Sequence, residues 1–97
     1  MEAQLAQTSP KTSRQLERHF KGIANHRRLD ILFLVKDSAG ISLKQIADEL
    51  KCNFKTVSEH TRRLVQAGLV NKKYRSQTVE HSLSPYDQKL VKLIQAF

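Results

Sequence analysis

The chain has 97 residues, which is enough for one small domain and too few for a second hydrophobic core. Its 17 Lys and Arg residues against 9 Asp and Glu residues give a formal net charge of +8, which favours an anionic partner such as nucleic acid without specifying one. The single cysteine excludes an internal disulfide, and no apolar run is long enough to cross a membrane.

Residues 1–12 are rich in Gln, Thr, Ser and Pro, a composition that cannot bury a core. We therefore expect a flexible tail over residues 1–12 and a single domain over residues 13–97. The first residues contain no apolar stretch of the kind found in a signal peptide, so we expect the protein to be cytoplasmic.

Two helices are predicted to begin the domain. Ser13 can cap a helix that runs to about residue 24, with Leu16 and Phe20 on one side of it. This spacing fits either a helix that covers its own subunit's core or one that contacts a second subunit. Asn25 can cap the second helix, from residue 26 to about residue 36, which is apolar almost all round and should be central.

One aromatic residue of the second helix is a candidate for a contact between subunits. Phe33 falls on the side opposite Leu32 and Val35, and that side should be wet in a monomer. Phe33 is therefore a candidate dimer contact, and the alternative is a simple exposed aromatic residue.

A helix-turn-helix is predicted in the middle of the chain. After a turn over residues 37–40 and a one-residue strand at Ile41, a capping box over residues 42–45 opens a short helix. Only two residues then separate this helix from Asn53, which can cap the next helix, over residues 53–67, closed by Gly68. Two helices joined by so short a turn must cross steeply, so the second is presented and the first braces it.

The presented helix has two different faces. Val57, Thr61 and Leu64 share one face and should pack, which leaves the opposite face free for a partner. Glu59 is able to accept from a cytosine amino group or to pair along the helix with Arg62 or Arg63. The alternative for the whole face is a solvated charged helix. The residues expected to face DNA are Asn53, Phe54, Lys55, Thr56, Ser58, Glu59 and Arg62.

The period of the pattern changes after the presented helix. Residues 69–74 and 78–83 are predicted to form two strands, with a turn over residues 75–77, so that the pair makes a hairpin called a wing. A hairpin that merely aids solubility is the alternative reading. The residues expected to contact the DNA backbone or the minor groove are Lys72, Lys73, Arg75 and Gln77.

A last helix begins at Ser84, with Pro85 in its first turn and Asp87 three residues after the cap. An apolar stripe follows that runs to the last residue and should be covered, by a second subunit or by the same one. The residues of this stripe are Tyr86, Leu90, Leu93, Ile94 and Phe97.

Four segments together resemble the ArsR/SmtB class of winged-helix repressors: residues 22–32, 43–50, 56–60 and 67–70. The resemblance covers roughly residues 16–84, and its most specific parts are residues 28–32 and 56–60. It implies a homodimer that binds operator DNA and releases it when an effector arrives, with the first and last helices building the dimer. The candidate dimer contacts on these two helices are Leu16, Phe20, Tyr86, Leu90, Leu93, Ile94 and Phe97, and Phe33 joins them from its position on the second helix.

Two residues depart from the pattern of that class. Many members have a basic or amide residue where this chain has Glu59, which leaves the base preference open. Thr61 replaces the usual leucine on the packed face and should loosen the core slightly.

The metal sites of the resembled class are not found in this sequence. Its thiolate sites use a Cys-x-Cys pair on the first helix of the helix-turn-helix, where residues 43–48 contain no cysteine, and its other common site needs histidine on the last helix, which has only Asp87. The four histidines are scattered through separate elements, whereas zinc needs about four converging ligands. We therefore expect no metal and no cofactor. The scattered histidines are His19, His26, His60 and His81.

Two further residues have structural roles in this interpretation. His60 is expected to be a partly buried hydrogen-bonding residue behind the presented helix. Cys52 is expected to be a small turn residue, and the alternative is a redox-sensing thiol with a lowered pKa at the amino end of a helix.

The sequence thus predicts a mainly α fold with a small β-hairpin, a winged helix-turn-helix. We expect a homodimeric, sequence-specific transcriptional regulator, most simply a repressor, with the helix over residues 53–67 in the major groove and the wing over residues 72–78 on the backbone or minor groove. No glycine-rich phosphate loop, nucleophile and base pair or carboxylate cluster suggests an enzyme. The alternatives are a winged-helix module for protein assembly or RNA binding, and a non-specific architectural DNA-binding protein.

Overall fold

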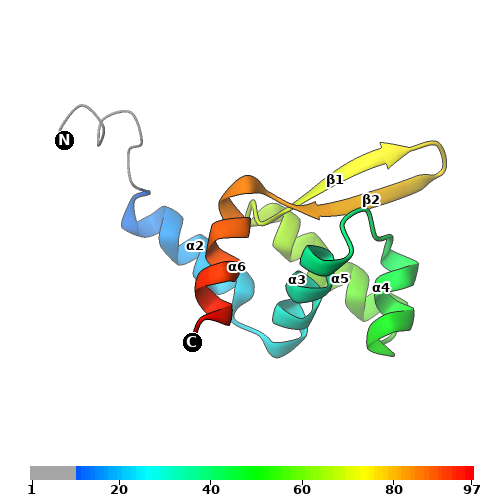
Figure 1. Ribbon diagram of the computed structural model, residues 1–97, viewed down its shortest axis with the longest axis horizontal. Coiled ribbons are helices and arrows are strands. Elements are labelled where there is room, and N and C mark those ends of the chain that lie inside the picture. Colours follow the sequence, from blue (N-terminus) through cyan, green and yellow to red (C-terminus); the bar gives the residue numbers. More distant parts are fainter. Residues whose placement is uncertain (1–10) are drawn as a thin grey trace.

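The computed structural model describes residues 11–97 (Figure 1). The expected flexible tail lies outside the described residues, apart from Lys11 and Thr12. The described part forms five helices and one antiparallel hairpin in the expected order. The elements are α2 (Ser13–Ile23), α3 (His26–Asp37), α4 (Leu43–Leu50), α5 (Phe54–Gln66), β1 (Val70–Arg75), β2 (Thr78–Leu83) and α6 (Pro85–Gln95).

The helix starts follow from side chains that accept the free amide groups of the first turn. Ser42 forms the expected capping box with Gln45 at α4, and Asn25 accepts from two amides at α3. At α2 the prediction was wrong by one residue: Thr12, not Ser13, is the cap. Its hydroxyl accepts from the Gln15 amide at 3.2 Å, and the Gln15 side chain accepts from the Thr12 amide at 2.8 Å.

The helix α3 is central, as its apolar composition predicted. Its Leu32 and Val35 side chains are fully buried, and α2, α4, α5 and α6 all pack around this helix (Figure 1). The core that it shares with the other elements includes Ile46 of α4, Leu64 of α5 and Val91 of α6.

The hairpin projects from the helical body at the end away from α2 (Figure 1). Its register pairs Val70 with Leu83 and Arg75 with Thr78, so the turn contains only Ser76 and the residue after it, not the three residues expected. Ser76 has a φ of 55°, the left-handed conformation that lets a two-residue turn match the strand twist. The predicted bridge at Ile41 is confirmed, opposite His81.

The last helix buries two residues outside the predicted apolar stripe and leaves part of that stripe uncovered within one subunit. Asp87 and Val91 are the fully buried residues of α6, whereas Leu93 is 59% exposed and Phe97, beyond the end of the helix at Gln95, is fully exposed. The apolar stripe therefore does not continue along the helix to the last residue. The α6 cap is as expected, since the Ser84 hydroxyl accepts from the Asp87 amide at 3.1 Å.

These elements form a winged helix-turn-helix: α4 and α5 are the two crossing helices, and β1 and β2 are the wing. Within residues 11–97, no helix is both long enough and apolar enough to span a membrane.

Candidate nucleic-acid interface

The presented helix α5 is fixed at its amino end and packed on one side. The Asn53 side chain accepts from the amides of Lys55 at 2.7 Å and Thr56 at 3.3 Å, which fixes the first turn. Lys51 takes the left-handed conformation, with a φ of 53°, and this reverses the chain between α4 and α5 within a few residues. The backbone of α5 is therefore placed by its neighbours before any partner binds.

The two faces of α5 are those predicted. Val57, Thr61 and Leu64 are buried, and Thr61 contributes a hydroxyl with no hydrogen-bond partner among the described residues. Of the residues expected to face DNA, only Ser58 is half-buried. The others are exposed: Asn53, Phe54, Lys55, Thr56, Glu59 and Arg62 on α5 and its cap, and Lys72, Lys73, Arg75 and Gln77 on the hairpin.

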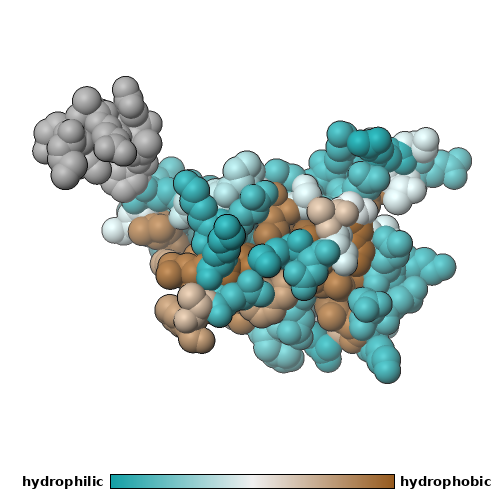
Figure 2. Space-filling view, in the orientation of Figure 1, coloured by the Kyte–Doolittle hydropathy of each residue, from teal (hydrophilic) through white to brown (hydrophobic). Residues whose placement is uncertain are grey.

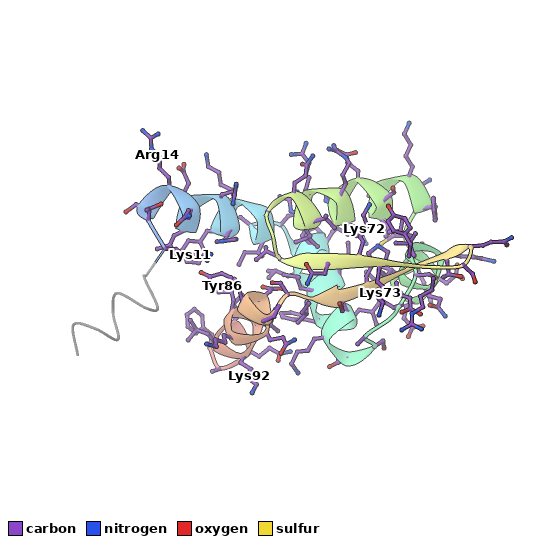
Figure 3. All side chains as sticks on the ribbon, turned by 90° about the horizontal axis from the view of Figure 1, so that it is seen from above. Lys11, Arg14, Lys72, Lys73, Tyr86 and Lys92 are labelled. Atoms are coloured by element: carbon purple, nitrogen blue, oxygen red, sulfur yellow. The ribbon has the colours of Figure 1, made fainter. Side chains whose placement is uncertain are left out.

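The structure brings part of the helix and part of the wing together. Ser58, Arg62 and Lys72 line a common pocket of about 160 Å³ between α5 and the hairpin. Lys73 lies on the other side of the hairpin, because side chains alternate along a strand (Figure 3). The two wing lysines thus face different ways, and only Lys72 extends the face of α5.

Glu59 makes the intrahelical pairing that the sequence left as an alternative. Both Arg62 Nη2 and Arg62 Nε donate to its carboxylate, the latter at 3.4 Å, and Arg63 Nε lies 3.7 Å away. The hydrogen bond from Arg62 lowers the pKa of Glu59 below its usual value. The carboxylate is therefore already engaged by arginines of its own helix.

His81, which the sequence reading left without a role, anchors the wing. It is buried, and its Nδ1 atom lies 2.9 Å from the carbonyl oxygen of Ile41. Burial is the main cause that lowers the pKa of His81, so the ring is neutral near neutral pH and Nδ1 carries the proton. The available signal was its position between Val79 and Leu83 on the inward side of β2.

Two other residues near the turn behave partly as expected. His60 is half-buried, but its Nδ1 atom has no hydrogen-bond partner within residues 11–97, contrary to the expected hydrogen-bonding role. Cys52 sits half-buried in the turn, where its Sγ atom accepts from Arg27 Nη1 at 2.7 Å and donates to the Leu50 carbonyl at 3.3 Å.

Apart from Phe33 of α3, the candidate dimer contacts belong to α2, to α6 and to the residues just after α6, and Figure 2 shows apolar side chains at that end of the molecule. His19 of α2 stacks on Tyr86 of α6 with ring centroids 4.8 Å apart, which joins the two helices. Phe20, Leu93 and Phe97 are exposed, and Leu16, Tyr86, Leu90 and Ile94 are half-buried. Phe33 is half-buried against its own core instead of standing free.

Among residues 11–97, no three histidine, cysteine or acidic side chains gather closely enough to hold a metal ion.

Comparison with known proteins places this geometry among transcriptional regulators. A family model described as bacterial regulatory protein, arsR family, matches residues 25–72. The transcriptional activator HlyU of Vibrio cholerae is 35% identical over 69 residues, which are 71% of this chain and 63% of that protein. The chain therefore spans a little under two thirds of that relative.

Solved structures of similar proteins show the same fold. HlyU from Vibrio cholerae N16961 superposes with a TM-score of 0.80 at 30% identity, over 89% of this chain and 94% of that one. The homodimeric winged helix-turn-helix DNA-binding domain Mb0332 from Mycobacterium bovis superposes with a TM-score of 0.79 at 25% identity, over 91% of this chain and 87% of that one.

Proposed function

The chain belongs to the ArsR family of bacterial regulatory proteins, which are DNA-binding transcriptional regulators, and from this premise we propose that it binds operator DNA as a homodimer. In this proposal α5 enters the major groove and the wing lies on the backbone or minor groove beside it. The protein acts in the cytoplasm and as a regulator, not as an enzyme.

The observation that carries the proposal is the rigid presentation of a polar face. The helix α5 is capped by Asn53 and packs against α4, and Lys72 of the wing extends its exposed face. That face has hydrogen-bond donors suited to phosphates and base edges. A solvated surface helix needs no such support. A family member named as a homodimer and the exposed Phe20, Leu93 and Phe97 support the dimer.

The direction of regulation forms a separate part of the proposal. Repression is the simpler mechanism, because a dimer bound across a promoter blocks access without a further contact. The similar protein HlyU is named an activator. The position of the operator relative to the promoter therefore decides the sign, and a reporter fused to the bound promoter measures it.

The test of DNA recognition begins with duplexes enriched by the protein from a random-sequence pool. Fluorescence anisotropy then compares an enriched duplex with a shuffled duplex of equal composition at near-physiological salt. We expect a preference of about a hundredfold or more for the enriched duplex. Equal, weak binding to both would indicate an architectural protein, and absence of binding would indicate an assembly or RNA-binding module.

A pair of variants locates the interface. The double substitution Arg62→Ala with Lys72→Ala should lose most of the affinity, because it removes one cation from α5 and the wing cation that extends the same face. The control is Lys36→Ala with Lys92→Ala, which removes the same charge from α3 and α6. Equal losses in both variants would show that net charge, and not this face, determines binding.

A further inference from the structure

A second basic site lies at the junction of α2, α3 and α5. A pocket of about 240 Å³ is lined there by four cationic side chains from three helices. Arg18 and Lys21 come from α2, Arg28 from α3 and Arg63 from α5, and no acidic residue is in the lining. Like charges gathered in one concave site attract an anion more strongly than the same charges spread over a surface.

Two nearby carboxylates reduce this charge without cancelling it. Glu17 pairs with Lys21 at 3.0 Å, and Glu59 lies 3.7 Å from Arg63 while it binds Arg62 more closely. Within the described part of the chain, no carboxylate lies in ion-pair range of Arg18 or Arg28. The pocket therefore keeps a surplus of positive charge.

Arg28 shows that the site lacks an acceptor. Its Nη2 atom donates to the Lys21 carbonyl at 3.4 Å, but its buried Nε atom has no hydrogen-bond partner among residues 11–97. Buried donors are nearly always paired in folded proteins. The charges of Arg28, Arg27 and Arg63 also lower the pKa of the neighbouring His60, after the larger effect of burial. The site therefore combines a cluster of positive charge with a buried donor that has no acceptor in this part of the chain.

The pocket exists because α2 and α5 approach closely. A side chain added at Gly22 would place its Cβ atom 2.7 Å from the Ala67 Cβ atom, so only glycine permits this contact. Arg18 and Lys21, on the turn of α2 around this contact, are thereby brought beside Arg63 and Gln66.

The pocket continues the exposed face of α5. Gln66 follows Arg62 by four residues and so shares its side of the helix, and Gln66 also lines the pocket. Figure 3 shows α2 and α5 along one edge of the molecule, with Arg14 pointing outward from that edge and Lys92 at the opposite edge.

We propose that the pocket formed by Arg18, Lys21, Arg28 and Arg63 binds a phosphate of the DNA backbone, beyond the base pairs contacted by α5. The inference rests on the proposed function and extends it: the DNA footprint runs from α5 onto α2. Guanidinium groups suit phosphate because they donate two parallel hydrogen bonds. A contact of this kind sets the position of the protein on the duplex and carries no sequence information.

The test compares charge removal in the pocket with equal charge removal elsewhere. The pocket variant is Arg18→Gln with Lys21→Gln, and the control is Lys36→Gln with Lys92→Gln on the far side. Affinity for the enriched and shuffled duplexes is measured over a series of KCl concentrations. The salt slope is the change in the logarithm of the binding constant with the logarithm of the salt concentration. A dimer has two pockets and each phosphate contributes about 0.9, so the magnitude of this slope should fall by about 2 in the pocket variant.

The variant should also lose about tenfold in affinity on both duplexes, with its preference between them unchanged. The charge-conserving exchange Arg18→Lys with Lys21→Arg should keep the wild-type slope, which separates lost charge from a folding defect. If the pocket variant keeps the slope of the control while wild-type protein still prefers the enriched duplex, the inference is overturned and the proposed function stands. If wild-type protein binds no duplex, both fail together.

A titration with inorganic phosphate tests whether the ligand of the pocket is a free anion or a phosphate of the DNA backbone. Amide chemical shifts around Arg63 and Gln66 are followed by NMR during a phosphate titration of wild-type protein. Saturable binding of free phosphate, combined with an unchanged DNA salt slope in the pocket variant, would overturn the assignment to the DNA backbone. Weak, unsaturated shifts together with the reduced DNA slope would support it.

Discussion

The carbonyl oxygen of Ile41 accepts two hydrogen bonds from His81, one from the backbone amide at 3.0 Å and one from the ring Nδ1 atom at 2.9 Å. The Gly40 amide in turn donates to the His81 carbonyl at 2.8 Å. These three bonds tie the wing to the segment that leads into α4. The position of the wing relative to the helix-turn-helix is therefore supported by two backbone hydrogen bonds and by the ring of one buried, neutral histidine.

His81 should make the fold sensitive to acid. Burial lowers the pKa of His81 below 6.5, so the unfolded chain takes up a proton first as the pH falls. The stability that depends on the neutral ring is present above about pH 6.5 and is lost as the pH falls through the folded-state pKa. His81→Asn keeps a donor near the Ile41 carbonyl but does not titrate, so its stability should fall less between about pH 7 and about pH 5.

Urea denaturation at one fixed protein concentration measures this difference. Burial is also the main cause that lowers the pKa values of His19 and His60, so the substitution should reduce the acid sensitivity without abolishing it. If the free energy of unfolding depends on pH identically in wild type and His81→Asn, protonation of His81 is not a cause of the acid sensitivity.

Asp87 should make the fold less stable as the pH rises, which is the opposite of the effect of His81. Its side chain is fully buried, its carboxyl oxygens have no hydrogen-bond partner within residues 11–97, and burial raises its pKa from 3.8 to about 7. Stability is fully present below the unfolded pKa and is lost as the pH rises toward about 7. Asp87→Asn should therefore be more stable than wild type at about pH 8, by at most about 4 kcal/mol.

The two proteins should converge well below pH 3.8, where the carboxyl group is protonated in both the folded and the unfolded state. Thermal melting across the pH range tests this, with the exposed Asp30→Asn as the matched control. A constant difference between Asp87→Asn and wild type at every pH would show that packing, and not ionisation, is the cause.

Gly22 should tolerate no side chain while Ala67 is its neighbour. Gly22→Ala places two Cβ atoms 2.7 Å apart, so α2 must move away from α5. Overpacking of this kind costs about 1 to 3 kcal/mol, measured by chemical denaturation. The double variant Gly22→Ala with Ala67→Gly should recover part of the loss, and an additive effect of the two substitutions would exclude the contact as the cause.

Replacing Thr61 by valine should stabilise the fold. It is 2% exposed, and its hydroxyl has no hydrogen-bond partner in the described residues, so valine of the same shape removes an unsatisfied buried group. Thr61→Val should raise the free energy of unfolding by about 1 kcal/mol. Thr61→Ser, which keeps the hydroxyl and removes a methyl group, should lower it, and a stabilised Thr61→Ser would refute this explanation.

Leu93 and Phe97 should contribute to the dimer. Both are large exposed apolar residues at the end formed by α2 and α6. Leu93→Gln with Phe97→Gln should weaken dimerisation about tenfold or more, measured by sedimentation equilibrium. Tyr74→Gln, on the wing and 72% exposed, is the control that should leave dimerisation unchanged. If the Leu93 and Phe97 variant dimerises as wild type does, these residues lie outside the interface.

Local signals were sufficient to predict most of the fold. Caps at Asn25, Ser42, Asn53 and Ser84 and the left-handed Gly68 each act within one helical turn, so neighbouring residues alone reveal them. The prediction of Ser13 as the cap of α2 was wrong because serine and threonine can both cap a helix. Gln15, three residues after Thr12, completes a capping box with Thr12 and so places the cap there.

Long-range packing explains what the sequence did not reveal. The α6 stripe was assigned from apolar residues, but the face that packs also contains Asp87, and nothing local marks an acid as buried. His81 acts on a carbonyl forty residues away. The basic pocket depends on the approach of α2 to α5 at Gly22. Its cations are up to 45 residues apart in the chain, so no local pattern indicates that they meet.

The pairing of Glu59 with Arg62 has a consequence for how the proposed DNA complex forms. An arginine already held by its own helix has fewer side-chain conformations to lose when it meets a base or a phosphate, so the helix is preorganised for binding. The same carboxylate repels any phosphate placed beside it. In the proposed complex, Glu59 would therefore disfavour wrong registers of α5 along the groove, so that selectivity would arise from repulsion as well as from contact.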